Sequence, residues 1–187
     1  MAIGFNHEQV PVGLKIAQAV GLTASAYLFG QNASISYIGV PALMQAPAPL
    51  AVKQWDTVYS IGKKTAPALA VVSSLALGYV TYHLDPRSLH YKLNLAATIL
   101  IPSIIPYTFA FIVPTNKKLY EKLRSLATTG LEDKAAEVGV AKKETVNALL
   151  DKWATLNLIR ALLAGAGAVL AAWGTVSHLQ ETVFIAS

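Results

Sequence analysis

The sequence contains no cysteine and carries little charge. The missing thiols exclude disulfides, thiolate metal sites, iron–sulfur clusters and a cysteine nucleophile. Charged residues make up only 13% of the 187 residues, and hydrophobic residues make up 54%. Soluble domains usually carry roughly a quarter charged residues, because their surface faces water. Lipid solvates the outside of a membrane protein instead. The composition therefore predicts one integral membrane domain, residues 1–187.

Four segments are long and apolar enough to cross a hydrocarbon core of about 30 Å. They predict an all-α, four-helix membrane bundle with spans at about residues 12–40, 65–82, 91–113 and 153–176. The first span is rich in small residues, which allow helices to pack closely in lipid. It also resembles a secretory signal with a cleavage site at Ala24-Ser25-Ala26. That interpretation is disfavoured, because no basic residue precedes Lys15 and the apolar pattern continues past this site.

Prolines and polar stretches set the expected limits of these spans. Pro41, Pro47 and Pro49 are expected to end the first span. Residues 50–64 are amphipathic and predict a helix at the membrane interface that leads into the second span. Two prolines, Pro102 and Pro106, are expected to interrupt the third span. The polar residues 114–151 predict two short amphipathic cytoplasmic helices.

The basic charge is unevenly distributed between the two ends of the predicted bundle. Three cations and three acids fall on the side of the termini, and the other side carries all of the net charge of +5. The positive-inside rule then predicts two larger basic loops in the cytoplasm and lumenal termini. This distribution explains the basic pI without nucleic acid, so we expect no nucleic-acid partner.

All four histidines fall on the predicted lumenal side, beside several carboxylates. They are His7, His83, His90 and His178. Imidazoles and carboxylates gathered at one end are possible ligands of copper, iron or zinc. No pair has the spacing of four residues that is typical of a helical ligand pair. We therefore expect no metal; if one binds, its ligands are His83, His90 and His178.

Two motifs are more specific than generic membrane sequence. The first is Pro106-Tyr-Thr108 followed by Pro114-Thr-Asn116, and the second is Trp153-x-x-x-Asn157-x-x-Arg160. With a looser pattern that includes Trp55, Tyr59 and Pro67, they resemble the anthrone oxygenase family over nearly the whole chain. This family consists of small fungal membrane proteins of aromatic polyketide pathways, with bacterial relatives.

The resemblance implies that an anthrone-type polycyclic phenol is oxidised by molecular oxygen to a quinone. It also implies no flavin, haem or nicotinamide, and residence in the endoplasmic reticulum. The sequence agrees on cofactors, since it has no glycine-rich dinucleotide loop and no haem-attachment motif. The expected partners are a hydrophobic small molecule and membrane lipid, with a possible homo-oligomer.

Such chemistry requires an apolar pocket, a base and donors for an oxyanion. Arg160 is the strongest donor candidate, and its spacing places it on one helix face with Trp153 and Asn157. Asn116, at the end of the third span, lies at the same depth. A structural alternative has Asn157 and Asn116 joining two spans while Arg160 reaches lipid headgroups.

The base is less defined by the sequence. His83 and His90 suit this role by pKa, but they lie at the membrane face opposite Arg160. The base is then a buried tyrosine (Tyr27, Tyr37 or Tyr107) or an acid such as Asp56; alternatively, catalysis is lumenal and the Asn157–Arg160 motif is scaffolding. We predict Arg160, Asn157, Asn116 and Tyr107 as catalytic residues. The predicted substrate-binding residues are Trp153, Thr108, Trp55, Tyr59 and Tyr37.

Other functions fit the same features. One is a membrane cyclase or isomerase that moves protons without consuming oxygen, and another is a non-catalytic scaffold for pathway enzymes. Transport is less favoured, because four spans with one internal arginine and no facing acid are few for a carrier.

Overall fold

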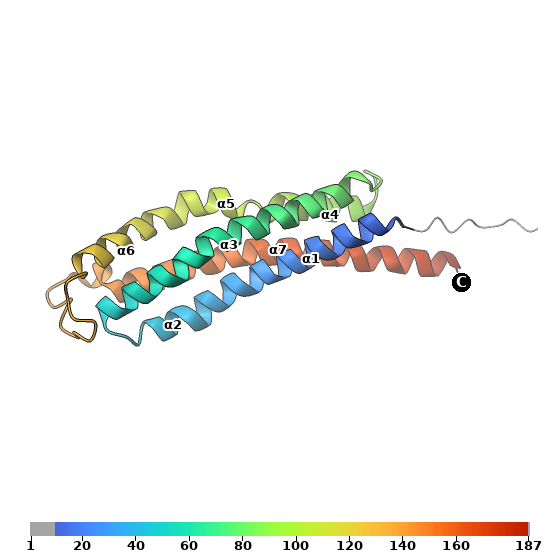
Figure 1. Ribbon diagram of the computed structural model, residues 1–187. Helices are drawn as coiled ribbons and strands as arrows, with labels where there is room; N and C mark the ends of the chain where they lie inside the picture. Colours follow the sequence, from blue (N-terminus) through green and yellow to red (C-terminus); the bar gives the residue numbers. More distant parts are fainter. Residues whose placement is uncertain (1–9, 187) are drawn as a thin grey trace, which may run out of the picture.

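The computed structural model describes the backbone of residues 10–186 and the side chains of residues 10–177. Over this range the chain forms four long helical rods (Figure 1). The first comprises α1 (Val12–Ser34), the π-helical turn η1 (Ile35–Gly39) and α2 (Val40–Leu43), and the second is α3 (Ala48–Tyr82). The third comprises α4 (Leu89–Leu100), α5 (Ile104–Tyr107), the π-helical turn η2 (Thr108–Ile112) and α6 (Val113–Ser125). The fourth is α7 (Val146–Ala186), preceded by the short 3-10 helix η3 (Lys142–Glu144).

The rods form a four-helix bundle, as the sequence predicts. Helix α1 packs against α3 and α7, and α4 packs against the same two helices. Each rod contains one expected span, and all four are long and apolar enough to cross a membrane. We call the end with the α2–α3 turn and the loop after α6 the loop end. The opposite end, where α1 begins and α3 meets α4, is the terminus end (Figure 1).

The prolines shape these rods differently from the prediction. Pro41 does not end the first rod, which continues to Leu43, and Pro114 does not end the third. Each of these prolines lies two residues after a π-helical turn. A proline inside a helix clashes with the carbonyl four residues earlier. A wider turn just before it relieves that clash while the helix continues.

The amphipathic stretch 50–64 leads directly into the expected second span, as predicted, and forms the first half of α3. Its Trp55 is fully buried in the bundle. By contrast, the polar stretch 114–151 does not form two short separate helices. Its ends extend the third and fourth rods as α6 and the start of α7, because their apolar residues pack into one core with Trp55. Pro102 and Pro106 do interrupt the third rod, which unwinds at Ile101–Ser103 between α4 and α5.

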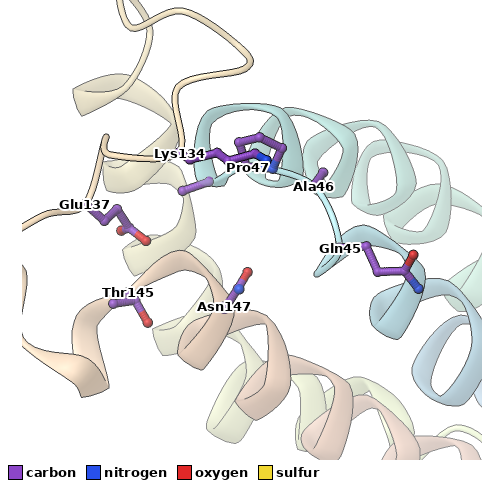
Figure 2. Close-up of a pocket in the computed structure, with 8 residues that line it drawn as sticks. Gln45, Ala46, Pro47, Lys134, Glu137, Thr145 and Asn147 are labelled. Carbon is purple, nitrogen blue, oxygen red and sulfur yellow. The ribbon is translucent and has the colours of Figure 1, made fainter.

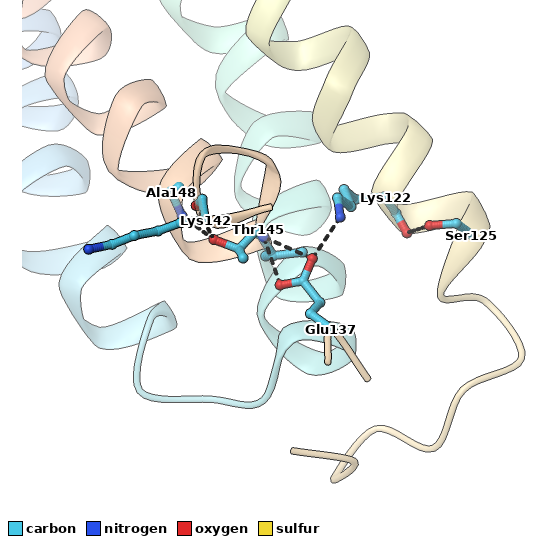
Figure 3. A network of polar contacts seen from close by, with 7 residues as sticks. Lys122, Ser125, Glu137, Lys142, Thr145 and Ala148 are labelled. Carbon is cyan, nitrogen blue, oxygen red and sulfur yellow. Dashed lines mark hydrogen bonds and ion pairs between the residues drawn. The ribbon is translucent and has the colours of Figure 1, made fainter. Parts of the chain in front are cut away.

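Glu137 holds the loop between α6 and α7 in place (Figure 3). Its carboxylate accepts a hydrogen bond from Lys122 Nζ at 2.8 Å. The same carboxylate accepts the backbone N–H of Val146, with its nearer oxygen at 2.9 Å. A carboxylate at a helix N-terminus satisfies a free N–H group and the helix dipole together. The loop thus ties α6 to the beginning of α7.

A pocket of about 350 Å³ lies beside this loop (Figure 2). The α2–α3 turn contributes Gln45 and Pro47, the loop contributes Lys134 and Glu137, and α7 contributes Asn147. Glu137 is already engaged by Lys122 and Val146. The one carboxylate of this pocket is therefore already used to hold the loop to the bundle.

Close helix contacts hold the terminus end together. A Cβ atom added to Gly21 on α1 would lie 2.7 Å from the Leu77 side chain on α3. The hydroxyl group of Ser73 on α3 donates to the carbonyl of Gly21 at 2.8 Å. Helix pairs in lipid typically have small residues where the two backbones come close, and a hydroxyl group that donates a hydrogen bond from one helix to the other.

The outside of the bundle is apolar on all four rods. Large exposed side chains include Phe29 on α1, Leu75 on α3, Phe109 on η2 and Val169 on α7. Soluble proteins expose apolar surface in single patches, whereas here apolar surface surrounds the whole bundle.

Candidate functional site

Arg160 on α7 lies at the centre of a polar network between the first, third and fourth rods. Its Nη2 donates to Asn32 Oδ1 on α1 at 2.8 Å and to Asn157 Oδ1. Its Nη1 lies 3.4 Å from the hydroxyl group of Thr108, which itself donates to the Ile104 carbonyl at 2.7 Å. The guanidinium group is therefore held inside the bundle by neutral groups.

Asn157 extends this network across α1. Its Nδ2 donates to the Asn32 carbonyl at 3.0 Å and to Ser36 Oγ at 2.8 Å. The Ser36 hydroxyl donates in turn to the Asn32 carbonyl at 2.9 Å. These bonds fix the orientation of the Asn157 amide, so its Oδ1 faces Arg160.

Both π-helical turns meet this network. Ser36 belongs to η1 and Thr108 begins η2. A π-helical turn changes the direction in which side chains leave a helix, and such turns occur often at functional sites. Here each one brings a hydroxyl group to the Asn157–Arg160 face of α7.

Four aromatic rings form a cluster on the loop-end side of the network; we call Trp55, Tyr59, Tyr120 and Trp153 the aromatic cluster. Trp55 stacks on Tyr59 with ring centroids 5.2 Å apart. Tyr120 and Trp153 contact Trp55 edge-on, at 5.3 and 6.2 Å. Trp153 Nε1 donates to Asn116 Oδ1 at 2.9 Å. The cluster joins α3, α6 and α7 beside Arg160.

Three buried N–H groups in this half have no acceptor among the residues that the structure describes. They are Arg160 Nε, Asn116 Nδ2 and Trp55 Nε1. The Asn116 assignment follows from its contact, because only its oxygen can accept from Trp153. Between residues 10 and 177, no carboxylate forms an ion pair with Arg160. A partly buried cation without a counter-charge, beside unmatched donors, favours a ligand with a negative oxygen.

Most of the predicted site residues come together here. Arg160, Asn157 and Thr108 are in direct contact, and Asn116 joins them through Trp153. Tyr107 is partly buried and directly precedes Thr108 in the chain. Their common depth and helix faces follow from the spacing of the two motifs.

Two expectations about tyrosines are wrong. Tyr37, expected to bind substrate, is 63% exposed on the outer face, and Tyr27 is 62% exposed. Neither is a buried base. The reason is helical phase, since buried Ser36 turns Tyr37, its neighbour in the chain, toward the outside.

The structural alternative had Asn157 and Asn116 joining two spans, but the described side chains show no bond between these two residues. Asn157 instead bonds to α1, and Asn116 accepts from Trp153. The sequence reasoning missed Asn32 and Ser36, which are buried in the first rod. A buried polar side chain in a long apolar segment was the signal that could have revealed Asn32.

His83 and His90 lie at the terminus end, away from this network. His83 lies on the surface, with Nδ1 2.9 Å from the Tyr79 carbonyl. His90 is buried, with Nδ1 3.0 Å from the Gly174 carbonyl on α7. The side chains of His7 and His178 lie outside the described residues. Within the described part, no three histidine or acidic side chains gather as metal ligands do.

The fold and these contacts define an α-helical bundle protein with a cationic, aromatic-rich site between its helices. The sequence profile described as anthrone oxygenase matches residues 55–170, which contain both motifs. The chain belongs to the anthrone oxygenase family, and the predicted resemblance is confirmed.

Named relatives extend this likeness over most of the chain. An anthrone oxygenase of Claviceps purpurea is 30% identical over 92% of this chain and 94% of its own. The anthrone oxygenase AgnL2 of Paecilomyces divaricatus is 32% identical over 84% and 94%. A noranthrone monooxygenase of Aspergillus flavus is 27% identical over 83% and 71%. These relatives confirm the prediction of a monooxygenase-type enzyme. No solved structure matches the chain.

Proposed function

We propose that this enzyme, embedded in a membrane, oxidises an anthrone-type polycyclic phenol to a quinone with molecular oxygen and without a cofactor. The observation that carries the proposal is Arg160, a cation enclosed by neutral partners with a buried N–H unmatched. A site of this kind binds a neutral substrate weakly and its anion strongly. That difference is what accelerates a reaction through an anionic intermediate.

The oxidation of an anthrone proceeds through such an anion. Removal of one benzylic proton from an anthrone gives a delocalised, phenolate-like anion. This anion passes one electron to oxygen, and recombination of the two radicals forms a carbon–oxygen bond as a peroxide. Loss of water, which takes the second benzylic hydrogen, leaves the quinone. One substrate and one O₂ thus give one quinone and one water.

The residues around Arg160 suit these steps. In the aromatic cluster, Tyr59 and Tyr120 are only partly buried, and their rings suit contact with a flat substrate. Asn116 Nδ2 and Trp55 Nε1 are further donors for a developing oxyanion. Tyr107 is the proposed base, because it directly precedes Thr108 of the network and is the one of the three expected tyrosines that is not exposed on the outer face.

The charges along the rods support a position in the bilayer. In α7 no charged residue follows Arg160 within the described side chains, and in α3 none follows Lys64. The rods contain 32 to 37 residues, or about 48 to 55 Å at the rise of an α-helix, which exceeds the hydrocarbon thickness. Arg160 then lies where the apolar region begins, and the aromatic cluster lies beyond it.

This depth suits an amphiphilic phenol that partitions into the membrane interface. The basic loop end faces the cytoplasm in this proposal, by the positive-inside rule. The endoplasmic reticulum is the proposed membrane, with lipid as the surrounding partner. Association into a homo-oligomer remains part of the proposal through the exposed apolar faces.

Oxygen uptake by the purified protein on emodin anthrone, after metal chelation and with elemental analysis, tests the proposal. We expect uptake with quinone formation, and a fall in kcat/KM of about 10²- to 10³-fold in Arg160→Ala. Lys152→Ala is the matched control, since it removes an exposed cation from the same helix. Unchanged uptake in Arg160→Ala would refute the role of Arg160. Absence of uptake on any anthrone would refute the oxygenase proposal and favour a cyclase or a scaffold.

Tyr107→Phe tests the base separately. General base catalysis typically contributes about 10²- to 10⁴-fold, so we expect a loss in that range. The loss should shrink as the pH rises, because hydroxide then removes the substrate proton. A small effect that does not depend on pH would contradict a role for Tyr107 as base.

A further inference from the structure

A second pocket lies at the terminus end, between all four rods. It has a volume of about 420 Å³ and a mostly apolar lining. Helix α1 contributes Leu14 and Ala19, the end of α3 contributes Val80, α4 contributes Asn94, and α7 contributes Thr175. Volumes of this size are typical of sites for small organic ligands.

The polar groups of this pocket are fixed by bonds between helices. Gln18 Nε2 donates to the Thr175 hydroxyl at 2.7 Å, which joins α1 to α7. His90 Nδ1 lies 3.0 Å from the Gly174 carbonyl, which joins α4 to α7. The pocket is thus a built cavity whose walls are held in place, and its shape does not depend on one mobile side chain.

Asn94 gives the pocket a chemical preference. It is 3% exposed, and its Nδ2 donates to the His90 carbonyl at 3.1 Å. The other atom of the amide, Oδ1, is buried and accepts no hydrogen bond from the described residues. A buried amide oxygen without a partner costs free energy that a ligand hydroxyl group recovers. Lys15 also lines the pocket, from an exposed position on α1.

The location separates this pocket from Arg160. Gly174 and Arg160 are fourteen residues apart on α7, or about 21 Å at the rise of an α-helix. One three-ring molecule therefore does not reach both sites. The two sites also differ in preference, since one has unmatched donors and the other has an unmatched acceptor.

We propose that this pocket is a second, non-catalytic binding site for a flat phenol in its neutral form, whose hydroxyl group donates to Asn94 Oδ1. The choice of a polycyclic phenol rests on the proposed function, because such a substrate reaches the bundle through the bilayer. The existence of the site rests on the cavity and on Asn94. Arg160 binds the anion, and the terminus-end pocket binds the protonated molecule.

Two stable ligands that differ by one hydroxyl group test this. The affinities of 2-hydroxyanthraquinone and anthraquinone are measured in lipid nanodiscs, below the pKa of the phenol, by quenching of tryptophan fluorescence. Trp173 precedes Gly174 in the chain, so Trp173→Phe identifies the signal from this end. We expect the hydroxylated ligand to bind about fivefold more tightly. Asn94→Leu should abolish this difference, and Arg160→Ala should preserve it.

A matched pair of variants tests the cavity itself. Ala19→Phe fills the pocket and should lower the affinity for both ligands at least tenfold, whereas Ile16→Phe adds the same ring to the outer face of α1 and should change neither affinity.

A preference for the hydroxylated ligand that survives Asn94→Leu overturns the proposal. So does an Ala19→Phe variant with unchanged affinity. Binding that ignores the hydroxyl group and is displaced by phospholipid shows an acyl-chain site instead. Oxygen uptake is not measured here, so these outcomes are independent of whether the enzyme acts on anthrones.

Discussion

The two halves of the bundle use opposite means to hold four helices together. In the loop half, large aromatic rings and the Arg160 network fill the centre, and three of the four unmatched groups there are donors, the fourth being Gln31 Oε1. In the terminus half, glycines and hydroxyl groups bring helices close, and a pocket remains with an unmatched acceptor. The same fold thus contains a half suited to an anion and a half suited to a neutral donor.

Removing the central ring of the loop half should have the largest effect on stability. Trp55 is fully buried and contacts three other rings, so Trp55→Ala leaves a large cavity. We expect a loss of about 3–5 kcal/mol in the free energy of unfolding, measured in mixed micelles. Trp173→Ala, at a position 62% exposed, should cost under about 1 kcal/mol. Equal losses would show that the aromatic cluster is not the core of this half.

Two of the buried asparagines, Asn157 in the loop half and Asn94 in the terminus half, give a direct comparison of the halves. Asn157→Leu removes an acceptor from Arg160 and a donor from Ser36 and the Asn32 carbonyl. We expect a loss of about 2–3 kcal/mol, because these groups remain buried without partners. Asn94→Leu removes one bond within its own helix and an unmatched oxygen, so it should be close to neutral. The same unfolding measurement on both variants checks this, and a larger loss for Asn94→Leu would reverse the comparison.

Glycine substitutions test the close packing of the terminus half. Gly21→Ala places a Cβ 2.7 Å from Leu77, and we expect a loss of about 1–3 kcal/mol. Gly30→Ala on the same helix meets no atom within 4 Å and should stabilise slightly, by helix propensity. Thermal unfolding of the two variants measures the difference. If Gly21→Ala did not lower the unfolding temperature, the close approach of α1 and α3 would not be what holds this half together.

The smallest expected effect concerns the loop. Glu137→Gln keeps the shape but removes the charge that faces Lys122 and the N-terminus of α7. We expect a loss of about 1 kcal/mol and faster hydrogen exchange at Val146. Glu132→Gln, on an exposed part of the same loop, is the control and should have no effect. Unchanged exchange at Val146 in Glu137→Gln would show that the loop is held by other contacts.

Sequence patterns predicted the bundle because its main causes are local. Apolar segments of sufficient length identify the four rods, and helical spacing places Trp153, Asn157 and Arg160 on one face. The prolines misled the prediction, since Pro41 and Pro114 follow π-helical turns that allow the helix to continue. Whether a helix widens before a proline depends on what packs around it.

The chain by itself determined the class of fold, the four apolar rods and the motif face of α7, because periodicity and hydropathy act within one helix. Only the tertiary structure decided the partners of that face: Asn32 from α1, Ser36 from η1 and Thr108 from η2. It also turned Tyr37 outward, buried Trp55 and opened the pocket beside Asn94. These outcomes depend on the rotation and register of one helix against another. Packing between residues far apart in the chain sets both.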